Sequence, residues 1–313
     1  MEKDLKIVFM GTPDFAIPTL RALTEHYRVV CAVTKPDKPK GRGNKLTPPP
    51  VKEFAQAHGI PVCQPENVKT PEFTAQLAEY GADLFVTCAY GKILPKSVLD
   101  LPKFGCINVH ASLLPKYRGA APLWHCVLNG DREVGVTTMF TDIGMDTGDM
   151  LLTETTQIDN DTTMGEVHDR LAEMGGRLIL RTIEAMQAGT LKRVPQKEED
   201  ATYAPMVSKA DAEIHWNKSA SEIHNLVRGM NPFPAAHTKL QGEPLKIYRT
   251  RICPGKNTEL PPGTVLPSEN GSLQVACGTG VLEILELQAA SSKRLESASY
   301  LFGHSFPAGV VLG

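Results

Sequence analysis

The first third of the chain alternates short apolar runs with stretches of helical spacing, and this alternation restricts the fold more than any other feature. Residues 6–10 and 28–34 are apolar runs of strand length, and between them Ile17, Leu20 and Leu23 recur at the spacing of one helix face. A strand, a tight turn, a helix and a second strand form a βαβ unit, whose strands are parallel and covered by the crossover helix. Further helices are expected over 51–58 and 71–79, and further strands around 60–64, 83–90 and 105–110. The pattern predicts an open, Rossmann-like parallel α/β sheet.

The rest of the chain divides at a polar stretch. A helical pattern over 159–189 begins with a capping box formed by Thr163 and Glu166. Residues 190–208 are polar, charged and without period, which is typical of a linker. Short β runs separated by Gly and Pro follow, and they predict a small antiparallel barrel or sandwich. The expected organisation is a domain over 1–189, a linker over 190–208 and a second domain over 209–313.

The composition excludes several classes of protein. With 42% hydrophobic and 22% charged residues the chain has the make-up of a soluble globular protein, and no apolar run approaches the roughly 18 residues of a membrane span. The formal net charge of −2 gives no global attraction to nucleic acid or anionic lipid, so a partner of that kind must be held by a local patch. The seven cysteines are scattered without a C-x-x-C, as in a reducing compartment, and no signal peptide precedes the first strand. A cytoplasmic protein without a membrane partner is expected.

The expected strand at 105–110 ends in two polar side chains. Side chains alternate along a strand, so Asn108 and His110 share one face while Ile107 and Val109 take the other. Ligands bind outside the carboxyl ends of the strands in open α/β sheets. There an amide can donate a hydrogen bond to a carbonyl oxygen that gains negative charge, and an imidazole can accept a proton from an attacking amine. Taken alone, the pair is equally compatible with capping of a turn.

Two loops strengthen the interpretation as an active site. The strand leads into the Pro- and Gly-rich loop 111–122, and a second loop, GMDTGD, offers Asp146 and Asp149, either of which can orient a histidine. An Asp in such a loop is also a common turn former. The histidines and acidic residues lack the spacing of metal ligands, so no metal is expected. The turn after the first strand lacks G-x-G-x-x-G, which argues against a dinucleotide.

Three motifs in this order, NVH at 108–110, SLLPKYRGAAP at 112–122 and DTGD at 146–149, resemble the folate-dependent formyltransferases. The resemblance implies attack of an amine on the formyl carbon of 10-formyltetrahydrofolate, the formyl-donor cosubstrate. It assigns catalysis to Asn108, which would stabilise the oxyanion, to His110, which would handle the proton directly or through water, and to Asp146, which would orient His110 or a bound water. It assigns binding of tetrahydrofolate to Ser112, Leu113, Leu114 and Pro115.

A basic stretch bears on the acceptor of the formyl group. Residues 35–52 hold six Lys or Arg against one Asp, and their Pro and Gly content marks a loop. Such a loop suits an RNA backbone, because phosphate contacts supply most sequence-independent affinity; alone it could equally be a solvated loop. Its cations expected to contact such a backbone are Lys38, Lys40, Arg42 and Lys45, and the resemblance described next makes tRNA their expected partner.

The whole chain is similar to the methionyl-tRNA formyltransferase family, including residues 209–313. That resemblance implies an OB-like C-terminal domain that helps to hold tRNA, a basic loop with Arg42 at the matching GRG position, and initiator methionyl-tRNA as acceptor. A monomer is expected. Trp124 and His125 are bulkier than the usual residues of the family, and their role is left open.

Three other functions are compatible with parts of this pattern. A sugar-nucleotide amine formyltransferase also combines this catalytic domain with a C-terminal barrel, but the basic stretch 35–52 argues against it. A binding protein without catalysis has no need of Asn108, His110 and Asp146 together. A hydrolase of 10-formyltetrahydrofolate needs neither the basic stretch nor the second domain.

Overall fold

The computed structural model describes residues 4–40, 43, 45–267, 271–304, 306–307 and 309–313. The chain forms two compact units, each assembled from three stretches. The first contains Met1–Pro122, Glu133–Gln157 and His168–Pro205, and the second contains Leu123–Arg132, Ile158–Val167 and Met206–Gly313. The sequence predicted two continuous domains, 1–189 and 209–313, whereas each compact unit combines stretches from different parts of the chain. The predicted domain boundaries therefore stay a proposal.

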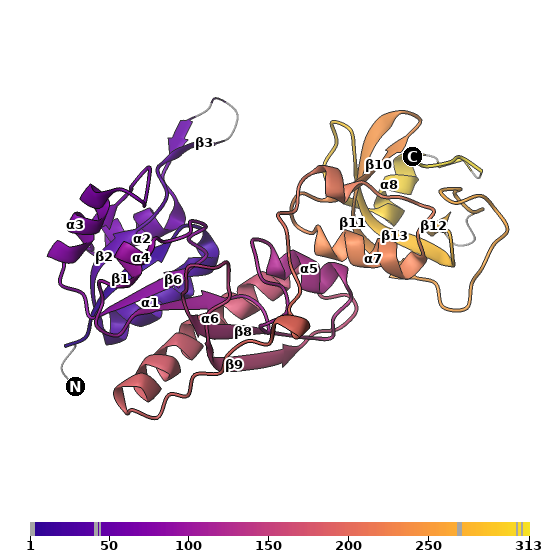
Figure 1. The fold of residues 1–313 in the computed structure, drawn as a ribbon. Coiled ribbons are helices and arrows are strands. Elements are labelled where there is room, and N and C mark those ends of the chain that lie inside the picture. The colour runs from indigo at the N-terminus through magenta and orange to yellow at the C-terminus, as the bar shows by residue number, and fades with distance from the viewer. Residues whose placement is uncertain (1–3, 41–42, 44, 268–270, 305, 308) are drawn as a thin grey trace. The chain divides into compact units, whose positions relative to one another are not determined.

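The first unit is built on a seven-stranded sheet with the order β5-β2-β1-β6-β7-β8-β9 (Figure 1). Strands β5 to β7 in this order are parallel, whereas β8 pairs antiparallel with β7 and β9 antiparallel with β8. After β7 the chain returns beside this strand without crossing the sheet, which makes the β8–β9 edge antiparallel. The five parallel strands with their connecting helices confirm the predicted α/β class. The strands are β1 (Lys6–Gly11), β2 (Arg28–Val33), β5 (Val62–Cys63), β6 (Leu84–Cys88), β7 (Cys106–His110), β8 (Glu133–Phe140) and β9 (Met150–Gln157).

Helices cover both faces of this sheet. They are η1 (Asp14–Ala16), α1 (Ile17–His26), α2 (Pro50–Ala57), α3 (Pro71–Glu79), α4 (Lys96–Leu99), α6 (Met164–Gln187) and η2 (Glu198–Asp200). The predicted capping box at the start of α6 is confirmed, since Thr163 N donates to Glu166 Oε2 at 2.8 Å and Glu166 N donates to Thr163 Oγ1 at 3.3 Å. At Gly175 a Cβ would lie 2.9 Å from Val109 Cγ1, so glycine allows α6 to approach β7 closely.

The opposite face carries a hydrophobic cluster that includes Phe73 and Leu77 of α3, Val98 of α4, and Phe85 and Cys106 from the sheet. Cys106 is two residues before Asn108 and four before His110, so all three side chains share this face of β7. This face of β7 is therefore apolar at its amino end, at Cys106, and polar toward its carboxyl end, at Asn108 and His110.

The basic stretch forms a hairpin rather than an irregular loop. Strand β3 (Lys38–Lys40) pairs antiparallel with β4 (Lys45–Thr47), and the hairpin projects from the body of the first unit (Figure 1). Lys38 and Lys45 are exposed. Arg42 and the side chain of Lys40 lie outside the described residues. No helix in the described ranges is long and apolar enough to cross a membrane.

The second unit contains an antiparallel sheet with the order β10-β11-β13-β12, and β14 pairs with β13. Isolated bridges join Val275 of β12 to Val265, Thr264 to Val311, and Leu312 to Leu240 of β10, so the pairing runs around a closed circuit, as in a barrel. The predicted C-terminal β domain is confirmed, and its OB-like topology stays a prediction. The elements are α5 (Pro122–Leu128), η3 (Ala210–Ala212), α7 (Ala220–Gly229), β10 (Ala236–Leu240), β11 (Glu243–Ile252), β12 (Leu273–Ala276), β13 (Val281–Ala289), β14 (Leu295–Glu296) and α8 (Ser297–Gly303).

The core of this unit explains the bulky side chain of Trp124, whose role could not be predicted from the sequence. Trp124 of α5 packs against the hydrophobic cluster that contains Trp216, Ile223 and Leu282, so its side chain contributes to the core of the second unit.

Candidate active site

The amide of Asn108 is oriented by the neighbouring strand. Register places Thr87 of β6 beside Asn108 of β7, and Thr87 Oγ1 donates to Asn108 Oδ1 at 2.8 Å. Thr87 is buried. Because the hydroxyl engages the oxygen end of the amide, the NH₂ end faces away from Thr87 and is the end that can donate to a ligand.

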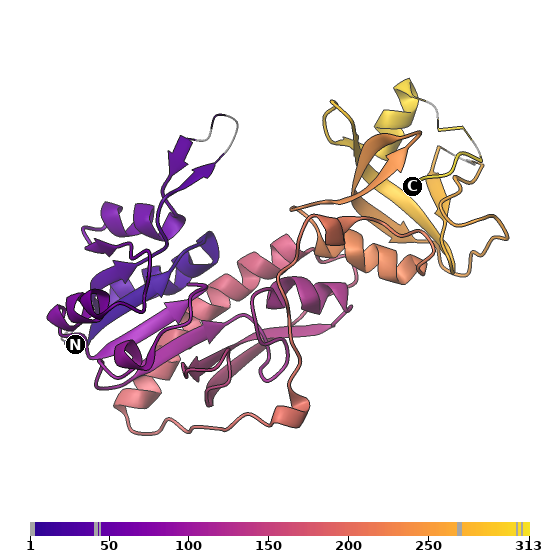
Figure 2. The same cartoon turned by 45° about the horizontal axis from the view of Figure 1, so that its top comes forward.

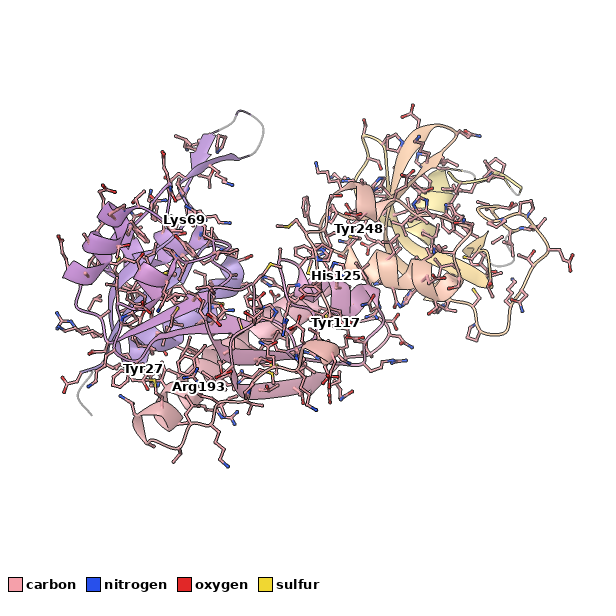
Figure 3. The ribbon with its side chains drawn as sticks, viewed as in Figure 1. Tyr27, Lys69, Tyr117, His125, Arg193 and Tyr248 are labelled. Atoms are coloured by element: carbon pink, nitrogen blue, oxygen red, sulfur yellow. The ribbon has the colours of Figure 1, made fainter. Side chains whose placement is uncertain are left out.

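The imidazole of His110 has a defined tautomer. Its Nε2 lies 3.0 Å from the carbonyl oxygen of Tyr117, which is labelled in Figure 3. A carbonyl oxygen only accepts, so Nε2 carries the proton and Nδ1 holds the lone pair of the neutral ring. Nδ1 lies 3.7 Å from Asp146 Oδ2, a distance that suits an ion pair after protonation better than a direct hydrogen bond. The side chain of His110 is 6% exposed and that of Asp146 18%.

The loop that follows β8 folds back along β7 and thereby places Asp146 beside His110. Strand β8 ends at Phe140 beside Ile107, and Thr141 N donates to the carbonyl oxygen of Cys106 at 2.8 Å, so the loop begins near the amino end of β7. Asp146 adopts a left-handed backbone, with φ of 57°, and its Oδ2 accepts from Gly119 N at 2.8 Å.

The other acidic residues of this loop point elsewhere. Asp149 Oδ2 accepts from Arg193 Nε at 2.9 Å, and Asp142 Oδ1 accepts from the backbone N–H of Ile143 at 2.7 Å. Of the two carboxylates that the sequence left open as partners of His110, only Asp146 is placed beside it.

Residues 112–115 form a packed loop. Ser112 Oγ donates to the carbonyl oxygen of Lys116 at 2.6 Å, and Thr137 Oγ1 donates to the carbonyl oxygen of Ser112 at 2.7 Å and accepts from Leu114 N at 3.2 Å. Ser112 and Leu114 are buried, whereas Leu113 and Pro115 are half-buried. The buried pair therefore sets the shape of the loop, and Leu113 and Pro115 keep part of their surface accessible.

The comparisons with known proteins assign the family. Residues 5–183 match the formyl transferase family, and residues 206–305 match the formyl transferase C-terminal domain. A methionyl-tRNA formyltransferase of Acetivibrio thermocellus is 52% identical over 310 residues, covering 99% of this chain and 100% of that protein. One from Pelobacter propionicus is 50% identical over 308 residues, covering 98% and 96%.

The chain belongs to the methionyl-tRNA formyltransferase family. The resemblance based on the three sequence motifs is thereby confirmed.

Solved structures support the fold of this formyltransferase at low sequence identity. An N-formyltransferase from Helicobacter canadensis, in complex with folinic acid and dTDP-3-aminofucose, gives a TM-score of 0.65 at 18% identity and covers 91% of this chain and 99% of that chain. HypX from Aquifex aeolicus, in complex with tetrahydrofolic acid, gives 0.60 at 19% identity and covers 94% of this chain and 46% of that chain.

Several lysines lie close together near the end of β2 in this formyltransferase. Burial lowers the pKa of Lys35, and the neighbouring charges of Lys38 and Lys92 lower it further. Hydrogen bonds from Gln64 and Lys52 lower the pKa of Asp37, which keeps that carboxylate ionised. Lys35 therefore has Lys38 and Lys92 as charged neighbours, while Lys52 is paired with Asp37 at 2.8 Å. Among the described residues, no group of three or more His, Cys, Asp or Glu side chains is placed to hold a metal ion.

Sequence reasoning missed Thr87, Tyr117 and Gly119 as supports of the site. Thr87 lies in an expected strand, but its position opposite Asn108 depends on the register of two strands. Tyr117 acts through its carbonyl oxygen and Gly119 through its N–H, so their side-chain types do not reveal these two contacts.

Proposed function

We propose that this enzyme transfers the formyl group of 10-formyltetrahydrofolate to the α-amino group of methionyl-initiator tRNA, giving N-formylmethionyl-tRNA for the initiation of translation. The observation that carries the chemistry is the convergence of Asn108, His110 and Asp146 at the carboxyl half of β7. The acceptor is inferred from the relatives, which are named methionyl-tRNA formyltransferase and match over nearly their full length.

In this proposal the NH₂ group of Asn108 stabilises the oxyanion. The amine attacks the formyl carbon, a new N–C bond forms, and the carbonyl oxygen gains negative charge before the bond to the folate nitrogen breaks. Thr87 holds the amide so that its donor end is presented. A preorganised donor of this type typically contributes about 10²–10³ in rate.

His110 handles the proton through Nδ1. Because Nε2–H is committed to Tyr117, the lone pair on Nδ1 accepts the proton that the attacking nitrogen loses, directly or through water, and returns it to the leaving folate nitrogen. Asp146, at 3.7 Å, stabilises the imidazolium that forms between the two transfers. The loop of Ser112, Leu113, Leu114 and Pro115 follows β7 directly and is assigned to the folate.

The tRNA is assigned to the β3–β4 hairpin and to the C-terminal unit. Lys38, Lys40, Arg42 and Lys45 would contact phosphates, which predicts affinity that falls steeply as salt rises. The enzyme is proposed to act in the cytoplasm, as a monomer.

A sugar-nucleotide amine is the alternative acceptor. WlaRD, a sugar 3N-formyl transferase, shares the fold, with a TM-score of 0.64 at 19% identity. That likeness supports the fold alone, whereas the relatives near 50% identity are named for methionyl-tRNA. The hairpin with exposed Lys38 and Lys45 also fits RNA better than a single nucleotide.

The test is formyl transfer from 10-formyltetrahydrofolate to charged initiator tRNA, with a nucleotide-sugar amine as comparison. We expect transfer to the tRNA, and a loss of at least about 10²-fold in kcat for Asn108→Ala and for His110→Ala. His26→Ala, at the exposed end of α1, is the matched control and should leave kcat unchanged. Preference for the sugar amine would reject the acceptor, and retained turnover in both active-site variants would reject the assigned roles.

A further inference from the structure

Residues 190–205, which make up most of the linker predicted over 190–208, run along the first unit (Figure 2) and are hydrogen-bonded to both loops of the active site. On one side Val194 exchanges two backbone hydrogen bonds with Met150, each 2.9 Å long. On the other side Arg118 N donates to the carbonyl oxygen of Thr202, and Ala204 N donates to the carbonyl oxygen of Arg118, both at 2.8 Å. The segment therefore connects the end of the Asp146 loop with the loop that follows β7.

Gln196 faces inward from the otherwise exposed run 192–200 of this segment. Residues 192–195 and 197–200 are exposed, whereas Gln196 is half-buried. Its Nε2 donates to the carbonyl oxygen of Asp146 at 2.8 Å and to that of Gly148 at 2.7 Å, and its Oε1 accepts from Arg118 Nε at 3.0 Å. Both amide hydrogens and the amide oxygen are thus engaged.

The orientation of this amide is fixed by chemistry. Carbonyl oxygens only accept and a guanidinium only donates, so a flipped amide would oppose like groups on both sides. Arg118 is 1% exposed and is itself held by Glu198, since its NH1 lies 2.7 Å from Glu198 Oε2. Hydrogen bonds from Arg118 and Tyr203 lower the pKa of Glu198, so this partner of Arg118 is ionised at neutral pH.

Gln196 is hydrogen-bonded to the backbone of the loop segment that directs Asp146 toward His110. Asp146 has a φ of 57°, a left-handed conformation that is unfavourable for most residues other than glycine and persists when neighbouring contacts hold it. Gln196 holds the carbonyl groups of Asp146 and Gly148, while Gly119 N holds the carboxylate. Arg118, the partner of Gln196, directly precedes Gly119 and follows Tyr117, whose carbonyl oxygen accepts from His110.

We propose that Gln196 is a positioning residue for formyl transfer, which acts by holding the backbone of Asp146 so that its carboxylate faces His110. The inference rests on the proposed role of Asp146. It also assigns the segment 190–205 a part in the active site.

Two substitutions test the donor function of the amide. Gln196→Glu keeps the shape and the bond to Arg118 but faces two carbonyl oxygens with a carboxylate oxygen, and Gln196→Met removes the polar groups without adding charge. We expect kcat to fall about 10–100-fold in both, with KM for the formyl donor within about threefold, because displacement by a fraction of an ångström impairs catalysis. Gln187→Glu, on the exposed end of α6, is the matched control and should leave kcat within about twofold.

A double-mutant cycle separates positioning from general stability. If Gln196 acts through Asp146, then Gln196→Glu should lower kcat no more than about twofold further in an Asp146→Ala enzyme. Melting temperatures and circular dichroism report folding, and Gln196→Met replaces Gln196→Glu in the cycle if the charged variant does not fold.

The outcomes are distinguishable. A kcat within twofold of wild type in the folded Gln196 variants would overturn the inference, and so would losses that multiply in the cycle. In either case a lowered kcat of Asp146→Ala would still support the proposed function. Full activity of Asp146→Ala would overturn the role of Asp146 and the inference with it. Lost kcat that does not multiply with Asp146→Ala supports the inference.

Discussion

Gly119 offers the most direct test of how the active-site loops are held together. Its φ of 117° favours glycine, and a Cβ at this position would lie 2.9 Å from the carbonyl oxygen of Ala204. That oxygen belongs to backbone fixed by two hydrogen bonds, from Ala204 N to Arg118 O at 2.8 Å and from Ala121 N to Ala204 O at 3.1 Å. Because these bonds tie Ala204 to residues on either side of Gly119, the methyl group of Gly119→Ala fits only if the backbone of residue 119 shifts relative to Ala204.

The size of the effect follows from the geometry. Ordinary contact begins near 3.4 Å, so the backbone of residue 119 must shift by about 0.5 Å. The 2.8 Å bond from Gly119 N to Asp146 Oδ2 would then lengthen beyond about 3.2 Å, outside the favourable range. A hydrogen bond to a charged group contributes about 1.5–3 kcal/mol, which corresponds to about 10–100-fold in rate if the loss falls on the transition state.

The assay is kcat for formyl transfer together with thermal unfolding. Gly59→Ala is the matched control, because Gly59 also has a positive φ, 67°, but no non-neighbouring described atom lies within 4 Å of its Cβ position. Both variants should lose stability through backbone strain of about 1–3 kcal/mol. Only Gly119→Ala should lose kcat. Equal effects on kcat in the two variants, or wild-type kcat in Gly119→Ala, would refute the reasoning.

Two further predictions concern other hydrogen bonds. Thr87→Val removes the hydroxyl that orients Asn108, so we expect kcat to fall about tenfold with little change in stability; unchanged kcat would show that the amide needs no such support. Burial lowers the pKa of His224 below its ordinary value of about 6.5, although a hydrogen bond to the carbonyl oxygen of Asn160 opposes the shift. The unfolded chain therefore takes up a proton first as pH falls. The free energy of unfolding should be insensitive to His224 above pH 6.5 and fall below it by at most about 1.4 kcal/mol per pH unit. Urea unfolding of wild type and His224→Gln at pH 7.5 and 5.5 measures this, and equal pH dependence would contradict it.

Local periodicity predicted the elements well where a segment satisfies its own pattern. The helix over Pro71–Glu79, the capping box before α6 and the strands β1, β2, β6 and β7 all follow from spacing and capping chemistry. The hairpin β3–β4 was missed, because Lys, Pro and Thr at residues 38–47 carry turn and charge signals that mask a short pairing.

The order of apolar and polar residues along the chain was enough to predict the α/β sheet, the C-terminal β section, and the common face of Asn108 and His110, because alternation along one strand is a property of neighbouring residues. The groups that support these two side chains depend on how distant segments come together in the folded protein. Thr87 meets Asn108 through strand register, Asp146 reaches His110 through a loop that folds back, and Gln196 approaches from a segment without pattern. These contacts join residues 21 to 50 positions apart, and the chain encodes them through the packing of the whole unit rather than through any local signal.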